Sequence, residues 1–374
     1  MLISAHFDSG NIDVVDCQSP QQVRLAIRPD LNSPHFQWFH FRADGLPVGQ
    51  PCTFSLINAH QASYSHAWPG YQTRASYDQQ HWFQIPTHYE QGELHFSLEP
   101  EQERAWFAYF EPYSRERHQW LVQRALALPG ARLAATGKSV EGREIPLLQI
   151  GHDHPAARRL WIIAQQHPGE HMAEWFMEGL VEYLQDNSPE VRQLLAQSTL
   201  YLVPCMNPDG AFRGHLRTNA AGRDLNRAWQ ETSAQETPEV YFVQQQMRKT
   251  GVDLFLDIHG DEEIPHVFAA GCEGNPGYSS RLARLEDEFR QRLEAAGEFQ
   301  SRYGYPRSAP GQANLALATQ ATGEAFDCLA LTLEMPFKDH DDQPHPLTGW
   351  NGPRSRQLAH AVGHVLAAMV GQLR

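Results

Sequence analysis

The chain has 374 residues, 41% of them hydrophobic, which is enough for two domains of ordinary size around a sizeable buried core. Its formal net charge of −14 argues against a nucleic-acid partner but excludes no class of small ligand. Its five cysteines lack C-x-x-C spacing, so neither a disulfide framework nor a cysteine zinc site is expected.

Residues 1–112 are predicted to form a small β domain. Short aromatic-rich runs alternate there with turn residues, at the spacing of a sandwich or barrel, and no helical periodicity of useful length interrupts them. The runs cover 35–45, 52–60, 81–89, 93–100 and 104–113. We therefore expect an all-β sandwich as the first domain.

Residues 113–374 are predicted to form an α/β domain. A helix ending at Pro129-Gly130 comes first, and a hairpin over 133–151 turns at Glu141-Gly142. Continuous apolar runs, typical of strands covered on both faces, then alternate with amphipathic helices. The runs are 160–164, 200–204, 252–258 and 329–335, and the helical stretches are 171–184, 281–297 and 358–373. This order predicts a mixed, mostly parallel central sheet flanked by helices.

The segment QQHPGEHMAEW, residues 165–175, contains two alternative zinc motifs. In the H-x-x-E-H interpretation both histidines bind the metal, whereas in the H-x-x-E interpretation His167 and Glu170 bind it and the second histidine lies elsewhere. The first needs a continuous helix, but within a helix proline costs about 3 kcal/mol and glycine about 1 kcal/mol. We therefore favour a loop at Pro168-Gly169, with His171 turned away from the metal.

Two further polar residues follow apolar strands. His259 ends the run DLFLDIH, with Asp257 placed to orient it, and Glu334 follows LTL. In an open α/β sheet the C-terminal ends of the strands form the crevice where ligands bind. His259 is therefore a candidate metal ligand. Glu334 either caps its strand in solvent or is a general base that takes the proton of a zinc-activated water and passes it to the leaving amine.

The stretch 207–229 offers groups that grip an anion. It begins with the turn NPDG and contains Arg217, Asn226 and Arg227. The planar fork of arginine matches a carboxylate, and it also polarises a carbonyl oxygen that becomes an oxyanion. The alternative is that these arginines are only surface charges.

Taken together, these segments resemble the zinc metallocarboxypeptidases, specifically the cytosolic carboxypeptidase subfamily. The matching motifs are, in chain order, HPGE, NPDG, R...GRDLNRAW, DIHG and TLE, and the hairpin GKSVEGREIPLLQIG and the junction FEPYS are similar as well. The resemblance implies one zinc ion per chain and a role for each matched residue. The metal ligands would be His167, Glu170 and His259. The general base and acid would be Glu334, and the residue that polarises the carbonyl would be Arg217. The terminal carboxylate would be held by Asn226 and Arg227.

The reaction that this resemblance implies is release of a C-terminal or side-chain-linked amino acid from peptides or protein tails. Family members commonly carry a mobile tyrosine ahead of the base glutamate, but residues 312–327 contain none, which leaves Tyr303 and Tyr305 as candidates.

The residue specificity is not evident from the motifs. Some cytosolic members favour C-terminal glutamate, and the candidates for a basic pocket are Arg302, Arg307 and Lys338. The remaining histidines near these motifs are expected to be structural or exposed: His152, His154, His171, His266, His340 and His345.

Two other functions carry the same motifs in part. A zinc amidohydrolase of the aspartoacylase or desuccinylase type, acting on N-acyl amino acids, also has H-x-x-E and an Asn-Arg pair, but a β domain that precedes the catalytic part disfavours it. A catalytically silent binding module would lack a ligand or the base, and neither is missing. The role of the β domain stays open, and so does a homo-oligomeric state.

The compartment is expected to be the cytoplasm. The chain does not open with a basic region followed by an apolar run, and no segment approaches the roughly 18 consecutive apolar residues of a membrane span. We therefore expect no membrane partner, and cysteines that stay reduced.

Overall fold

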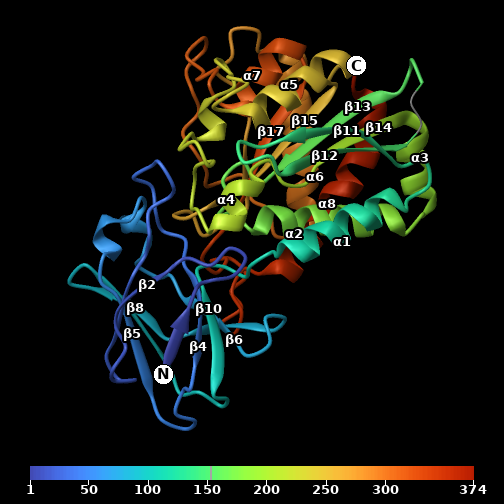
Figure 1. The fold of residues 1–374 in the computed structure, drawn as a ribbon. Helices are drawn as coiled ribbons and strands as arrows, with labels where there is room; N and C mark the ends of the chain where they lie inside the picture. The colour runs from blue at the N-terminus through green and yellow to red at the C-terminus, as the bar shows by residue number, and fades with distance from the viewer. Residues whose placement is uncertain (152–153) are drawn as a thin grey trace.

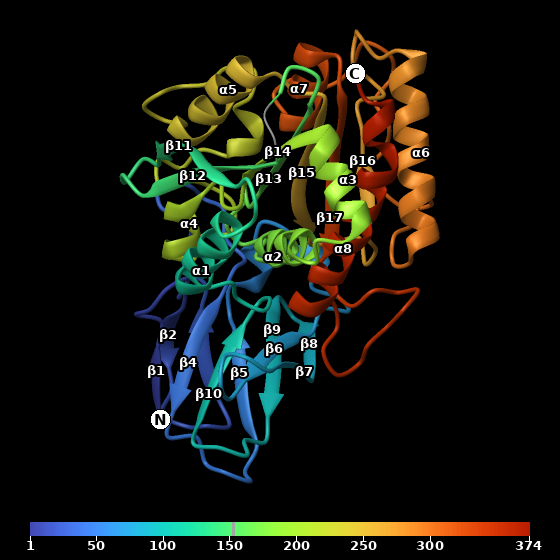
Figure 2. The same ribbon diagram turned by 90° about the vertical axis from the view of Figure 1, so that its right-hand side faces the viewer.

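The computed structural model describes residues 1–151 and 154–374, so His152 lies outside the described residues. A β-rich part formed by the N-terminal residues packs against one end of a larger α/β part (Figures 1 and 2). This is the predicted fold class, which is therefore confirmed. Among the described residues, no helix has both the length and the apolar character that crossing a bilayer requires.

The β-rich part is a sandwich of two five-stranded sheets. One sheet contains β1 (Leu2–Ser4), β4 (His40–Asp44), β10 (Arg104–Ala108), β6 (Thr73–Ser76) and β7 (Trp82–Ile85), in that order. The other contains β2 (Asp13–Asp16), β3 (Val23–Ala26), β5 (Cys52–Leu56), β9 (Glu93–Leu98) and β8 (Thr87–Glu90). Phenylalanines from both sheets meet between them, with ring centroids 4.7 Å apart for Phe54 and Phe107. Aromatic burial therefore holds the two sheets together.

One predicted strand of the sandwich proved to be two. The run 81–89 divides at Pro86 into β7 and β8, which belong to different sheets. Proline has no backbone N–H for a ladder, so the chain leaves one sheet there and joins the other. The run 35–45 is also shorter than predicted, since only residues 40–44 are extended and paired.

The α/β part is built on a seven-stranded mixed sheet. Its order is β11 (Arg132–Lys138), β12 (Glu144–Gly151), β14 (Ser198–Val203), β13 (Arg158–Ala164), β15 (Leu254–Asp261), β17 (Leu329–Pro336) and β16 (Phe268–Ala270). The neighbours β14, β13, β15 and β17 are parallel, and both edges are antiparallel. The predicted hairpin at the start of this part is present as β11 and β12.

Helices cover both faces of this sheet. They are α1 (Arg115–Leu126), α2 (Met172–Gln185), α3 (Pro189–Gln197), α4 (Pro208–Arg213), α5 (Pro238–Thr250), α6 (Ser280–Ala296), α7 (Ala318–Phe326) and α8 (Gly352–Met369). Alternate residues of a strand face opposite cores, so Leu160 and Ile162 pack in the core that includes α2 and α8. Trp161 and Ile163 pack in the core that includes α5. This explains why the strands are continuous apolar runs.

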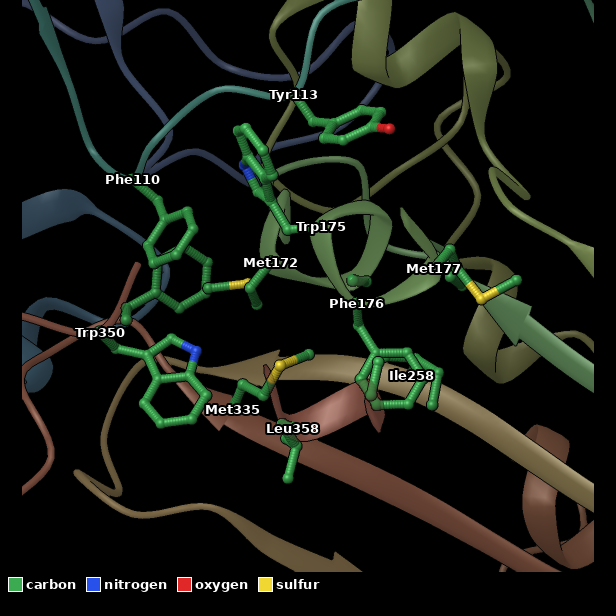
Figure 3. Close-up of a cluster of buried hydrophobic side chains, with 14 of the residues drawn as sticks. Phe110, Tyr113, Met172, Trp175, Phe176, Met177, Ile258, Met335, Trp350 and Leu358 are labelled. Carbon is green, nitrogen blue, oxygen red and sulfur yellow. The ribbon is translucent and has the colours of Figure 1, made fainter. Parts of the chain in front are cut away.

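The two parts share a buried contact (Figure 3). Phe110 and Tyr113, which follow the sandwich, lie beside side chains of α2, and the Tyr113 ring meets that of Trp175 edge-on at 5.0 Å. The buried Arg74 of β6 donates hydrogen bonds to the carbonyls of Phe337 and Trp350. We propose the domain boundary in this segment, between residues 112 and 113.

Candidate active site

Three of the predicted residues meet near the C-terminal ends of β13 and β15. Glu170 Oε1 lies 2.6 Å from His167 Nδ1, and Oε2 lies 2.7 Å from His259 Nδ1. All three side chains are buried, and each offers one ligand atom within 4.8 Å of the others. Gly260 N also donates to Glu170 Oε2, at 3.1 Å. The structure thus brings His259 next to His167 and Glu170, although 89 positions separate His259 from Glu170 in the sequence.

The loop that carries His167 and Glu170 has the predicted form. The helix α2 begins only at Met172, so Pro168 and Gly169 lie outside it and the continuous helix of an H-x-x-E-H site is absent. Gly169 N donates to Leu216 O at 3.0 Å, and a Cβ on Gly169 would lie only 2.9 Å from that oxygen. Glycine is therefore required for this close approach of two loops.

His171 is turned away from the other two histidines of the region. Its Nδ1 accepts a hydrogen bond from Tyr113 N at 2.9 Å, and its ring stacks on Trp38 at 4.2 Å. Burial lowers the pKa of His171 to about 3, so the ring is neutral. This histidine therefore joins the sandwich to α2.

A carboxylate orients each of the two clustered histidines. Asp257 Oδ2 lies 2.9 Å from His259 Nε2, as the sequence predicted for this aspartate. Asp224 Oδ1 lies 3.1 Å from His167 Nε2, which sequence reasoning missed. The available signal was the position of Asp224 in GRDLNR, two residues before Asn226, but its partner is 57 residues away in the chain. Both rings therefore direct Nδ1 toward Glu170.

The charges of this cluster are strongly coupled. Burial favours neutral Glu170, but the neighbouring His167 and His259 outweigh it and lower the pKa of Glu170. Burial likewise opposes the charged form of His259, but Asp257 and Glu170 raise the pKa of His259 well above its ordinary value. The carboxylates of the cluster thus carry more negative charge than its two histidines can neutralise. This excess of negative charge suits a divalent cation.

The donor set of this cluster fits zinc. Two imidazoles and one carboxylate, each imidazole held by a second carboxylate, are the ligands and outer partners that zinc takes in hydrolytic sites. The ligand atoms already face one another in a buried position. A cation held there would leave a further coordination position for water or substrate.

Glu334 lies beside this cluster. The register of β15 and β17 places it directly opposite His259, and both strands continue two residues beyond these side chains, to Asp261 and Pro336. Glu334 Oε2 is buried without a hydrogen-bond partner among the described residues. Burial is the main cause that raises the pKa of Glu334 well above its ordinary value, and His259 acts in the opposite sense. A buried carboxylate oxygen without a partner among the described residues, next to a cluster that could hold a metal, is a candidate general base.

Tyr305, not Tyr303, reaches this glutamate. The Tyr305 hydroxyl lies 3.1 Å from Glu334 Oε1 and 2.7 Å from Asp261 Oδ2. The Tyr303 ring instead stacks on His266 at 4.7 Å. Of the two candidates, only Tyr305 therefore touches a predicted site residue.

The three predicted anion-binding residues lie around Asp224. Arg217 Nε donates to Asp224 Oδ2 at 2.8 Å, and although burial opposes its charge, Asp224 raises the pKa of Arg217 above its ordinary range. Asn226 Nδ2 lies 3.4 Å from His259 Nε2. Arg227 is exposed, and within the described part of the chain no ion pair joins it to an acidic side chain. A part-buried and an exposed guanidinium thus flank the histidine cluster.

The other residues considered from the sequence have partners outside the cluster. Arg307 pairs with Glu273 at 3.3 Å, and Arg302 lies over the Tyr303 ring. Burial lowers the pKa of Lys338, whereas the nearby Asp261 and Glu263 raise it. Among the described residues, none of these contacts joins the three basic side chains to Asn226 or Arg227.

A second group of metal-binding types contains His266, His340 and Asp342. Both ring nitrogens of His340 are engaged by the backbone, because Nε2 lies 2.8 Å from Glu298 O and Nδ1 accepts from Asp342 N at 3.2 Å. This histidine therefore has no free nitrogen for a metal, in keeping with the structural role expected for it.

Two family models match the chain. The cytosolic carboxypeptidase N-terminal domain matches residues 3–110, and the zinc carboxypeptidase domain matches residues 118–341.

The chain is also similar to individual proteins. It is 45% identical to an uncharacterised protein of Zymomonas mobilis, over 100% of this chain and 97% of that one. It is 25% identical to cytosolic carboxypeptidase 1 of Mus musculus over 73% of this chain, and it spans only 26% of the mouse protein.

Solved structures share its fold. A metallo-carboxypeptidase from Pseudomonas aeruginosa, in complex with (2-guanidinoethylmercapto)succinic acid, is 62% identical over 100% of both chains, with a TM-score of 0.99. A metallo-carboxypeptidase from Burkholderia cenocepacia is 41% identical over 99% of both chains, with a TM-score of 0.96.

Proposed function

Since the chain belongs to the zinc carboxypeptidase family and carries the N-terminal domain of the cytosolic carboxypeptidases, we propose that it hydrolyses the bond of a C-terminal or side-chain-linked amino acid in peptides or protein tails. That it is a zinc-dependent peptidase of the carboxypeptidase type follows from the family. The residue roles, the metal stoichiometry and the substrate class below are our proposals. The observation that carries them is Glu334, whose partnerless buried oxygen lies next to the His167–Glu170–His259 cluster.

The metal would be one zinc ion per chain, held by His167 Nδ1, His259 Nδ1 and the Glu170 carboxylate. When bound, zinc makes water a nucleophile at neutral pH and polarises the substrate carbonyl. The contribution of this chain is to keep both imidazoles in the orientation that presents Nδ1, through Asp224 and Asp257.

Glu334 is the proposed general base and acid. Its carboxylate takes the proton from the attacking water and delivers it to the amine that leaves. The carboxylate form that a base needs would be favoured by the positive charge of a metal ion held in the neighbouring cluster. The hydrogen bond from Tyr305 fixes Oε1 and leaves Oε2 as the atom that receives the proton.

Arg217 and Arg227 have different proposed roles because they differ in burial. The side chain of Arg217 is only 12% exposed, and its guanidinium donates to the carbonyl oxygen as negative charge develops there in the transition state. Arg227 is exposed, and together with Asn226 it binds the free carboxylate at the end of the substrate. This pair is what restricts cleavage to the end of a chain.

Tyr305 is the proposed substrate-closing tyrosine. Its hydroxyl lies 3.1 Å from the base, whereas its side chain as a whole is 46% exposed. A ring that is exposed on one side and hydrogen-bonded at its tip is suited to cover a bound residue.

The proposed substrate class and compartment of this protein are inferred from its relatives. The Pseudomonas aeruginosa protein is in complex with (2-guanidinoethylmercapto)succinic acid, whose carboxylates suit Asn226 and Arg227, and we propose this compound as a ligand here. We also propose that the protein acts in the cytoplasm, as the name of the N-terminal domain family suggests. The position of that domain before the catalytic one disfavours the N-acyl amino acid hydrolase alternative.

The test is release of amino acids from peptides that differ only in the C-terminal residue, measured by mass spectrometry. We expect stepwise shortening of peptides with one class of terminal residue, and no shortening of the same peptides with an amidated C-terminus. N-Acetyl amino acids are assayed in parallel. Cleavage of these alone, with every peptide intact, would contradict the proposed function.

A further inference from the structure

One carboxylate of the sandwich holds the backbone on both sides of Arg217. Asp30, in the segment between β3 and β4, is 3% exposed. Its Oδ1 accepts from Leu216 N at 2.7 Å, and its Oδ2 accepts from Arg217 N and from Thr218 N, both at 2.8 Å. The Thr218 hydroxyl adds a fourth bond at 3.1 Å. Three successive amides of the loop are thus bound to one side chain from the other domain.

The rest of this loop also lies on the sandwich. Further hydrogen bonds join Asn11 Nδ2 to Gly214 O at 2.8 Å, Leu31 N to His215 Nε2 at 2.9 Å, and Asn32 Nδ2 to Ala220 O at 3.0 Å. Gly222 has φ of +78°, and a Cβ there would lie 2.2 Å from Asn32 O. The loop 214–222 is therefore shaped against the sandwich backbone.

A tyrosine of the sandwich contacts the Arg217 guanidinium itself. Arg217 Nη1 donates to the Tyr64 hydroxyl, and Arg217 Cζ lies 5.8 Å from the Tyr64 ring centre. Tyr64 is held in turn by the buried Gln37, whose Oε1 accepts from Tyr64 N at 2.8 Å. With Asp224 on Nε, the guanidinium is fixed from both domains, and its Nη2 makes no hydrogen bond to another described residue.

We propose that Asp30 and Tyr64 are positioning residues that aim Arg217 at the substrate carbonyl, so that the sandwich completes the active site. This rests on the proposed role of Arg217. A free arginine side chain loses rotamer entropy when it is held in one orientation, and a donor stabilises an oxyanion best when it needs no reorganisation. Asp30 fixes the backbone of Arg217 and Tyr64 binds its guanidinium, which leaves Nη2 available for the substrate carbonyl.

The first test is Tyr64→Phe, which keeps the ring and removes the hydroxyl. We expect kcat on a cleaved peptide to fall about tenfold, with KM within about twofold, because the interaction acts in the transition state. Zinc content and Tm should be unchanged. The matched control is Tyr77→Phe, a sandwich tyrosine whose hydroxyl accepts from Glu101 N, and it should keep full kcat.

The second test is Asp30→Asn, with Asp78→Asn as its control. Asp78 also binds backbone amides, those of Gln80 and His81, but in a turn of the sandwich that lacks these contacts to the Arg217 loop. We expect Asp30→Asn to lower kcat at least as much as Tyr64→Phe does, with zinc retained. Asp78→Asn should keep kcat.

The decisive test is a double-mutant cycle with Arg217→Gln. If Tyr64 acts through Arg217, Tyr64→Phe lowers kcat about tenfold in the natural chain and less than about twofold in the Arg217→Gln background. Equal effects in both backgrounds, or an unchanged kcat in Tyr64→Phe, would overturn the positioning role while leaving that of Arg217 intact. An active Arg217→Gln variant would instead contradict the proposed role of Arg217 itself, and this proposal with it.

Discussion

The sandwich and the α/β part place their functional side chains differently because their strands are buried differently. In the sandwich, β5 and β9 alternate between buried and partly exposed residues, since each sheet has one packed face. In the α/β part, every residue of β15 and β17 is buried. His259 and Glu334 lie near the C-terminal ends of these strands, the position where open α/β sheets bind their ligands. The sandwich instead extends Asp30 and Tyr64 from its loops.

The two parts therefore contribute different kinds of groups to the proposed site. Under the proposed function, the α/β part supplies the metal ligands and the general base, whereas the sandwich supplies groups that hold the Arg217 side chain in place.

The largest effect on kcat is expected for Glu334, the proposed general base in the α/β part. Glu334→Gln removes the proton acceptor while keeping the side-chain size, so kcat should fall about 10³-fold with little change in KM. Zinc content, measured by mass spectrometry of the metal, should stay equal to that of the natural chain. A variant that retains more than a tenth of the natural kcat would show that another group is the base.

The junction between the two parts should respond to pH through Glu111. Its carboxylate accepts from Gly352 N at 2.7 Å, and burial raises the pKa of Glu111 to about 7. A carboxyl group whose pKa is higher in the folded chain than in the unfolded chain makes its full contribution to stability at pH values below its unfolded pKa. That contribution is lost as the pH rises through its folded pKa. Stability should therefore fall between about pH 4.5 and pH 8, by about 3 kcal/mol from this group.

The check is urea unfolding of the natural chain and of Glu111→Gln at pH 5 and pH 8. The glutamine stays neutral and keeps an acceptor oxygen, so the variant should gain relative stability at pH 8 and little at pH 5. Other titrating groups cancel in the comparison of the two proteins. The same difference at both pH values would rule out a buried, protonated Glu111.

Asp224, which contacts His167, should affect the affinity for zinc. Asp224→Asn should weaken zinc binding about 10-fold to 100-fold, because the imidazole loses a carboxylate that orients it. Competition with a chromogenic chelator measures the change. Asp186→Asn, an exposed aspartate after α2, is the control and should bind zinc as the natural chain does. Unchanged affinity in Asp224→Asn would mean that Asp224 serves Arg217 alone.

Tyr305 should have the smallest effect. Tyr305→Phe removes a single hydrogen bond to Glu334, equivalent to about 1 kcal/mol or a fivefold change in kcat/KM. Tyr303→Phe, whose ring stacks on His266, is the control. A larger loss in the Tyr303 variant would transfer the proposed role to that residue.

Much of the fold and of the candidate site could be predicted where the signal is local. Continuous apolar runs predicted the buried strands, and Pro168-Gly169 predicted the loop that separates His167 from His171. The division of 81–89 at Pro86 also had a local signal, but the aromatic character of the run concealed it. Local sequence patterns were thus sufficient to predict the secondary-structure elements and the candidate residues next to strand ends.

The missed residues depend on contacts between distant segments. Asp30 is an ordinary loop aspartate until the fold places it against the backbone of residues 216–218, 186 or more positions later. Tyr64 lies in an aromatic-rich domain where a single tyrosine gives no signal, and its partner is 153 positions away. Spacing rules cannot predict such pairs because nothing in either segment specifies the other.

The most direct test of the central claim is the release of C-terminal residues by the natural chain and by Glu334→Gln, with both proteins loaded to equal zinc content. We predict that the natural chain shortens free-carboxylate peptides one residue at a time, and that the variant leaves them intact although it binds zinc. Equal shortening by both proteins would contradict the assignment of Glu334. If the natural chain left every peptide intact with zinc bound, the proposed exopeptidase activity would be wrong.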